Sequence, residues 1–206
     1  MPGNEVLILF AHPAFEKSRV NRALVEAVRD LRGVTFHDLY EAYPDFHVDV
    51  RREQELLVAH RTLVFQHPLF WYSTPSLLKE WQDLVLEHGW AYGKEGGALR
   101  GKTALSAVTI GGDEDAYRPD GYNRFTLRQL LAPIEQSARL CGMDYLPPFA
   151  VHGTLAMTRA EMGAHAGDYR RLIEALRDGR VDLARARELD RINARLDAVI
   201  TGAEEE

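Results

Sequence analysis

Three short stretches of the chain carry side chains suited to a small, anionic, planar molecule. The first is AHPAFEKSRVN, residues 11–21. Ser18 stands where a serine caps a helix, which leaves free backbone N–H groups facing the preceding loop. Such a helix N-terminus attracts anions, and His12 and Asn21 offer further donors to a phosphate. The stretch lacks the G-x-G-x-x-G spacing of the usual dinucleotide-binding turn. In the simpler interpretation, Ser18 is only a cap and His12 a surface residue.

The second stretch, FQHPLFWYSTP at residues 65–75, places three aromatic residues directly after an apolar run. Aromatic side chains usually belong to a core, and Trp71 and Tyr72 are open to that interpretation. Their position favours another, because residues just past the carboxyl end of a strand lie at the rim of a sheet. A flat conjugated ring needs a flat apolar wall and a few backbone donors at its edge. Phe70, Trp71 and Tyr72 together supply both.

The third stretch is TIGGDEDAYRPDGYNRF, residues 109–125. Gly111 and Gly112 allow the backbone to approach a ligand closely with its N–H groups exposed. About fifteen residues then precede the next helix, and connections of that length in compact domains are more often functional. A plain surface loop is the alternative, but three aromatic residues argue against it: Tyr117, Tyr122 and Phe125.

A phosphorylated, planar, heteroaromatic ligand fits all three stretches. Flavin mononucleotide (FMN) is the economical choice, because its phosphate needs no glycine repeat. The eight histidines form no i, i+4 pair and no group with ligand spacing, so we expect no metal site.

The elements that must position these stretches alternate between strands and helices. Apolar runs predict strands at residues 5–10, 34–39, 62–66, 102–112 and 149–151. Apolar residues at helical spacing predict helices at residues 20–31, 52–59, 75–88 and 126–142, with two more closing the chain at roughly 159–176 and 182–200. The arginines of the last helix are typical of a solvated face.

This alternation indicates an α/β fold. We expect one domain over residues 1–206: a doubly wound, five-stranded parallel sheet of flavodoxin-like order 2-1-3-4-5 with helices on both faces. In such sheets ligands bind beyond the carboxyl ends of the strands. The three stretches follow the first, third and fourth strands, so they meet at one edge.

Composition narrows the function classes. The chain has 206 residues, 46% of them hydrophobic, and a net charge of −6, which argues against a large nucleic-acid interface. No apolar run is long enough to cross a bilayer, and the N-terminal residues lack the basic start of a signal peptide. The single cysteine cannot form an internal disulfide. We therefore expect a cytoplasmic protein.

In order and spacing, several motifs resemble one family. They are AHP…S-x-x-N, then P-L-F-W-Y-S-x-P-x-x-L-K-x-W-x-D, then T-x-G-G followed by G-Y-N-R-F, and finally C-G-M with P-P-F. The chain resembles the flavodoxin-like NAD(P)H:quinone oxidoreductases, a group that includes the ancillary subunits of glutathione-gated potassium-efflux systems. The resemblance covers roughly residues 6–151.

The resemblance implies a set of flavin contacts. The phosphate and ribityl chain would lie at His12, Ser18, Arg19, Val20 and Asn21. The isoalloxazine ring would lie at Leu69, Phe70, Trp71 and Tyr72, and its polar edge at Thr109, Ile110, Gly111 and Gly112. The active-site tyrosine of the family falls on Tyr117. Asn123 stands where better-studied members have a histidine, and an asparagine cannot carry a proton. The proton would then come from solvent or a partner chain.

The implied activity is two-electron transfer from NAD(P)H through the flavin to a quinone in a ping-pong cycle. The flavin would be FMN, with FAD as the alternative, and the family forms homodimers. Two other functions stay open. The chain could be a regulatory subunit of a membrane potassium-efflux protein and so lie at the membrane through that partner. It could also be a flavodoxin-like electron carrier.

Overall fold

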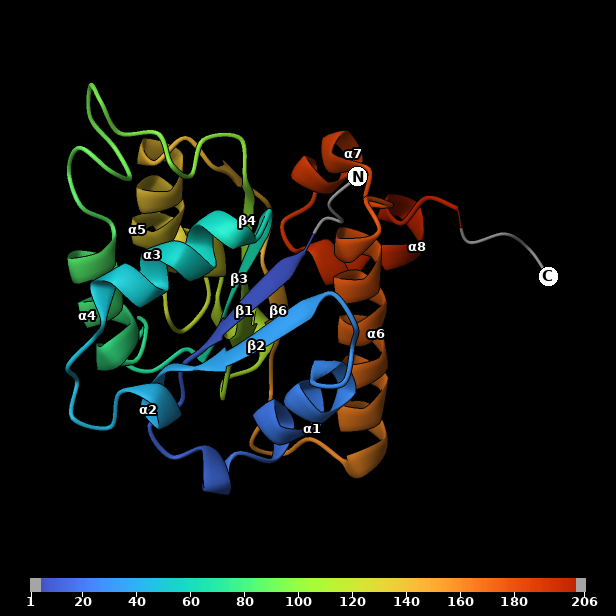
Figure 1. Ribbon diagram of the computed structural model, residues 1–206. Coiled ribbons are helices and arrows are strands. Elements are labelled where there is room, and N and C mark those ends of the chain that lie inside the picture. The colour runs from blue at the N-terminus through green and yellow to red at the C-terminus, as the bar shows by residue number, and fades with distance from the viewer. Residues whose placement is uncertain (1–4, 203–206) are drawn as a thin grey trace.

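A six-stranded parallel sheet forms the centre of the computed structural model, which describes residues 5–202 (Figure 1). The strands are β1 (Val6–Phe10), β2 (Val34–Asp38), β3 (Thr62–Pro68), β4 (Thr103–Thr109), β5 (Asp144–Tyr145) and β6 (Phe149–Val151). Their order is β2-β1-β3-β4-β5, with β6 also paired to β4, and every pairing is parallel. The predicted order 2-1-3-4-5 is confirmed.

The sequence predicts a single last strand where the structure has two short ones. Tyr145 and Phe149 end and begin these strands, and Pro147 and Pro148 lie between them. Proline has no backbone N–H to donate, so this pair interrupts the ladder along β4. The strand resumes at Phe149, which pairs with Ala107.

Helices cover both faces of the sheet (Figure 1). One face packs against α1 (Arg19–Val28) and α6 (Arg159–Arg177), and the other against α3 (Val50–Ala59), α4 (Ser76–Val85) and α5 (Leu127–Leu140). The short α2 (Leu39–Ala42) follows β2. Because side chains alternate along a strand, Val6 and Ile8 of β1 enter the first core while Leu7 and Leu9 enter the second.

The end of the chain differs from the prediction of one helix over residues 182–200. It forms α7 (Leu183–Arg187), a 3-10 turn η3 (Ile192–Ala194) and α8 (Leu196–Val199). The interruption has a tertiary cause. The Ile192 N–H donates to the Pro148 carbonyl, and the Asn193 side chain bonds both backbone groups of Ala150. These bonds to the sheet edge replace the local helical ones.

The register brings the chemically interesting loops together. Phe10 of β1 pairs with Gln66 of β3, and Pro68 of β3 pairs with Thr109 of β4. The loops after these three strands therefore leave the sheet at the same edge, as expected for a parallel sheet. None of the helices within residues 5–202 combines the length and the apolar character that crossing a bilayer requires.

Candidate functional site

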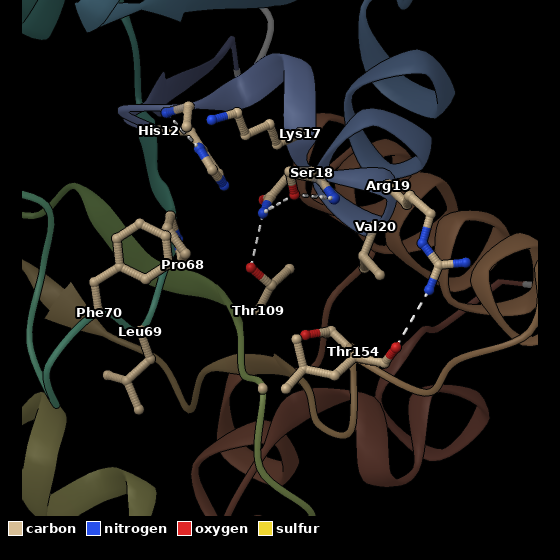
Figure 2. A pocket seen from close by; sticks show the side chains of 14 residues that line it. His12, Lys17, Ser18, Arg19, Val20, Pro68, Leu69, Phe70, Thr109 and Thr154 are labelled. Carbon is tan, nitrogen blue, oxygen red and sulfur yellow. Dashed lines mark hydrogen bonds between the residues drawn. The ribbon is translucent and has the colours of Figure 1, made fainter.

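A cavity of about 420 Å³ opens at the carboxyl ends of β1, β3 and β4 (Figure 2). Nine of the residues expected to contact flavin line it: His12, Ser18, Arg19, Val20, Asn21, Leu69, Phe70, Thr109 and Gly111. They come from three loops and the first turn of α1. The structure thus assembles the predicted phosphate region and one part of the predicted ring region around a single space.

The first turn of α1 is built around Ser18 and Asn21. Ser18 Oγ accepts the backbone N–H of Asn21 at 3.3 Å, which is the helix cap expected from the sequence. The Asn21 amide nitrogen donates to Ser18 Oγ at 3.1 Å and to Thr109 Oγ1 at 2.8 Å, tying α1 to the end of β4 (Figure 2). Asn21 Oδ1 is buried and has no hydrogen-bond partner among residues 5–202. An acceptor left free beside a cavity is a group that a ligand donor can satisfy.

His12 lies at the end of β1 and is fixed by its own loop. Its Nδ1 accepts the Ala14 N–H at 3.1 Å, so in the neutral ring Nε2 carries the proton. Burial lowers the pKa of His12, and the nearby Glu16 carboxylate only partly opposes that effect. His12 is therefore a neutral N–H donor at physiological pH. Its ring meets the edge of Phe70 at 5.5 Å between centroids, which joins the first and second loops.

The aromatic stretch forms a tight turn. Phe70 and Ser73 exchange both backbone hydrogen bonds, at 3.1 and 3.0 Å. Trp71 and Tyr72 between them have φ of 48° and 63°, as the two central residues of a type I′ turn require. Residues other than glycine are strained in this conformation because of their Cβ atom. The turn points Trp71 outward with 94% of its surface exposed, so Trp71 and Tyr72 stand at the rim and do not line the cavity.

Only some of the residues predicted in the third loop line the cavity. Gly111 lines the cavity, whereas the Ile110 side chain is fully buried in the core. At Gly112 a Cβ atom would lie 3.3 Å from the Tyr117 ring, so glycine there lets that ring approach. Tyr117 follows a 3-10 turn, η2 (Glu114–Ala116), and its N–H donates to the Glu114 carbonyl. The predicted polar edge is thus only partly in contact with the cavity.

Tyr117 and Asn123 lie beside the cavity and do not line it. Tyr117 instead lines a second cavity of about 290 Å³. Asn123 is linked to the aromatic turn, because the Tyr72 hydroxyl donates to its Oδ1 at 3.2 Å. Burial raises the pKa of Tyr117, the neighbouring Tyr72 adds to that effect, and a hydrogen bond with Asn123 only partly opposes both. Tyr117 therefore stays protonated at neutral pH and can donate a hydrogen bond.

Five residues that line the cavity were missed by sequence reasoning: Ala14, Lys17, Pro68, Thr154 and Leu155. Lys17 precedes the helix cap and brings a positive charge to the anion-attracting end of α1. A basic residue next to a predicted cap is a signal that the sequence does contain. Thr154 and Leu155 follow β6, and a loop after this strand was not considered. Arg19 donates to the Leu155 carbonyl at 3.4 Å (Figure 2). It also donates to the Met157 carbonyl at 3.4 Å, and so holds that loop against α1.

Two further observations concern the remaining side chains. Trp81, on the apolar face of α4, is fully buried and donates from Nε1 to Glu53. It belongs to the core of this chain. Among residues 5–202, no three His, Cys, Asp or Glu side chains gather closely enough to hold a metal ion.

Comparison with known proteins shows which family has this architecture. Residues 4–173 match a family described as having a flavodoxin-like fold. The glutathione-regulated potassium-efflux system ancillary protein KefG of Serratia proteamaculans is 46% identical over 80% of this chain and 90% of its own.

Solved structures agree with this placement. General stress protein 14 of Treponema denticola, in complex with FMN, is 40% identical with a TM-score of 0.80, covering 84% of this chain and 99% of its own. An NADPH-quinone reductase from P. pentosaceus is 31% identical with a TM-score of 0.75, covering 82% and 97%. The chain belongs to the family of flavodoxin-like proteins that includes NADPH-quinone reductases and the KefG ancillary proteins.

Proposed function

We propose that this protein binds FMN in the 420 Å³ cavity and transfers two electrons from NAD(P)H to a quinone. The observation that carries the proposal is the end of α1. There a capped helix N-terminus and Lys17 lie at one space, and Asn21, whose buried Oδ1 has no partner among residues 5–202, lines it too. A helix N-terminus with an adjacent cation suits a phosphate. The free acceptor suits a hydroxyl donor such as those of a ribityl chain.

The other residues at the cavity would each contact a different part of FMN. His12 Nε2–H and the first N–H groups of α1 would hold the phosphate, and Asn21 and Thr109 the sugar chain. Leu69 and Phe70 form the apolar wall for the ring, with Gly111 at its polar edge. Trp71 and Tyr72 would border the ring from the rim. FAD would need a further surface for its adenosine, so FMN is the simpler occupant.

In this proposal the flavin, when bound, supplies the hydride chemistry and the chain supplies orientation and protons. Gly111, which lines the cavity, would let the backbone approach the ring edge, where its N–H group would stabilise negative charge on the ring. Tyr117, protonated and backed by Asn123, would donate a hydrogen bond to the nicotinamide amide or to a quinone oxygen. Asn123 would orient Tyr117 and carries no proton, so solvent or a partner chain would supply the proton.

An absorption spectrum of the purified protein, taken with FMN and then with anaerobic NADPH, tests the proposal. Bound flavin bands that bleach on NADPH and return on adding a quinone would support it. They would also argue against a simple electron carrier, which needs no nicotinamide site. A protein that neither retains nor takes up FMN would overturn it.

The role of Tyr117 has its own test. Tyr117→Phe should slow quinone turnover about tenfold without releasing flavin, because one donated hydrogen bond is lost. Tyr122→Phe is the matched control, since Tyr122 lies in the same loop and is almost fully exposed. Equal kinetics for the two variants would remove Tyr117 from the mechanism.

A second candidate function is regulation of a membrane potassium-efflux protein, favoured by the KefG name of the Serratia relative. The exposed aromatic rim formed by Trp71, Tyr72 and Tyr122 gives a surface for a partner, either that protein or a second copy of this chain. Sedimentation would decide whether the chain is a homodimer. Co-purification with an efflux protein that survives Tyr117→Phe would separate the regulatory role from catalysis.

A further inference from the structure

The last segment of the chain reaches the loop that carries Tyr117. Arg191 Nη2 lies 2.7 Å from Glu114 Oε2, in an ion pair with side chains 29% and 51% exposed. Glu114 opens the 3-10 turn that ends at Tyr117. Arg191 lies beyond residue 173, where the match to the family ends. This contact is therefore made by a part of the chain outside the matched region.

Arg191 is anchored by the residues that follow it. The Ile192 N–H donates to the Pro148 carbonyl at 2.9 Å. Asn193 Oδ1 accepts the Ala150 N–H at 3.0 Å, and Asn193 Nδ2 donates to the Ala150 carbonyl at 2.9 Å. The side-chain amide thus takes the place of a neighbouring strand along the edge of β6. Arg191 consequently starts from a backbone that is fixed to the sheet.

The other end of the ion pair leads directly to Tyr117. The Tyr117 N–H donates to the Glu114 carbonyl at 3.0 Å, so a shift of Glu114 moves the tyrosine backbone. His152, just past the end of β6, packs against the Tyr117 ring with 5.7 Å between centroids. The β6 edge therefore holds this loop at two points: the ring through His152 and the turn through Arg191.

We propose that Arg191 is a positioning residue, which holds the Tyr117 loop in place for the reaction through Glu114. The inference rests on the proposed function. Residues 113–125 have little regular structure of their own beyond η2, so contacts from outside must fix their conformation. Without the ion pair the loop opens more often, and Tyr117 spends less time where it can meet a substrate.

Hydrogen–deuterium exchange and steady-state kinetics on Arg191→Gln test this. Amides within residues 113–125 should exchange about threefold faster, the size of effect that one partly exposed ion pair produces. The kcat/KM for a benzoquinone should fall by a similar factor while the affinity for FMN stays the same. A charge-swapped variant, Arg191→Glu with Glu114→Arg, should restore slow exchange.

Arg187→Gln is the matched control. Arg187 belongs to the same closing segment and pairs with Asp144 of β5, away from the Tyr117 loop. Equal exchange in residues 113–125 for the Arg187 and Arg191 variants would overturn the proposal. The exchange measurement needs no activity. A wild-type protein that fails to oxidise NADPH would end the proposed function, yet the loop contact would still be decided.

Discussion

Two groups of buried polar side chains in this molecule differ in whether the chain itself supplies their hydrogen-bond partners. In the Glu53 cluster, made of Glu53, His37, Tyr43 and Trp81, both carboxylate oxygens of Glu53 accept hydrogen bonds. His37 and Tyr43 bond Glu53 Oε1 at 2.8 and 2.5 Å, and Trp81 bonds Oε2 at 2.8 Å. At the carboxyl edge of the sheet, by contrast, Asn21 Oδ1 and His67 Nε2 are buried with no partner among residues 5–202.

The difference separates a structural role from a binding role. A buried polar group that the chain itself satisfies stabilises one conformation, and its loss is felt in folding. A buried polar group left free costs free energy in the folded state. At Asn21, which lines the cavity, a ligand that donates a hydrogen bond would offset this cost. Mutations in the Glu53 cluster should therefore change stability, and mutations of the residues that line the cavity should change binding more than stability.

The largest effect is expected in the Glu53 cluster. Glu53→Ala leaves three donors without their acceptor in the core, which should lower the free energy of unfolding by about 3–5 kcal/mol. Urea denaturation measures it. Glu55→Ala on the same helix is the control, because that carboxylate is exposed and its one ion pair within residues 5–202 is with Arg51, so its loss should cost under about 0.5 kcal/mol. Similar costs for the two variants would mean that the cluster is not structural.

The free energy of unfolding should also depend on pH through His67. Burial lowers the pKa of His67 to about 4, and its hydrogen bond to the Pro68 carbonyl opposes this only in part. Its ordinary pKa of 6.5 applies when the chain is unfolded. As the pH falls from 6.5 to 4, the unfolded chain binds a proton that the folded chain does not, and stability declines.

The slope assigned to His67 approaches about 1.4 kcal/mol per pH unit over that window. Urea denaturation at several pH values, compared between wild type and His67→Gln, isolates this slope from the other titrating groups. Below pH 4.5, Glu53 adds to the decline. Burial alone would raise the pKa of Glu53, but its hydrogen bonds from His37, Tyr43 and Trp81 lower it instead. Parallel curves of unfolding free energy against pH for wild type and His67→Gln would show that His67 titrates normally.

Two residues that cap helices, one at the cavity and one away from it, allow the same comparison between matched positions. Ser18 caps α1 at the cavity, and Asp49 caps α3 on the other face of the sheet. Replacing either with alanine should lower the free energy of unfolding by about 1 kcal/mol. Only Ser18→Ala should also weaken FMN binding, by about tenfold, since its Oγ holds Asn21. Flavin fluorescence titration measures this. Equal FMN affinity in both variants would mean that Ser18 is only a cap.

The sequence predicts the parts of this fold that local pattern decides. Apolar runs located β1 and β3 within one or two residues, and the alternation of strands and helices gave the order of the sheet. The break in the last helix could not be found in this way. It depends on Asn193 meeting the backbone of Ala150, two residues far apart in the chain.

The candidate site likewise has residues that local sequence predicts and residues that depend on tertiary structure. Ser18, Asn21 and Thr109 lie where their positions after strands predict. The outward direction of Trp71 was not predictable from composition, because it follows from a turn with two positive φ angles, a conformation that bulky residues rarely adopt. The contribution of the loop after β6 was missed for a similar reason, since Arg19 draws it toward α1 through backbone carbonyls.

The smallest effect on stability, and the sharpest contrast with Glu53, is expected at Trp71. Trp71→Gly relieves the strain of a positive φ, and the exposed indole makes few contacts to lose. The added flexibility of the unfolded chain offsets this gain, so the free energy of unfolding should change by less than about 0.5 kcal/mol. Flavin retention or self-association should nevertheless weaken.

Phe46→Gly is the matched control, because Phe46 also has a positive φ but packs its ring against Tyr40 at 5.9 Å. It should lower the free energy of unfolding by about 1 kcal/mol and leave flavin binding alone. If Trp71→Gly instead raised stability and left both flavin retention and self-association intact, the strained turn would serve neither function. Weaker flavin retention or weaker self-association would show that Trp71 acts through something that it contacts outside its own chain.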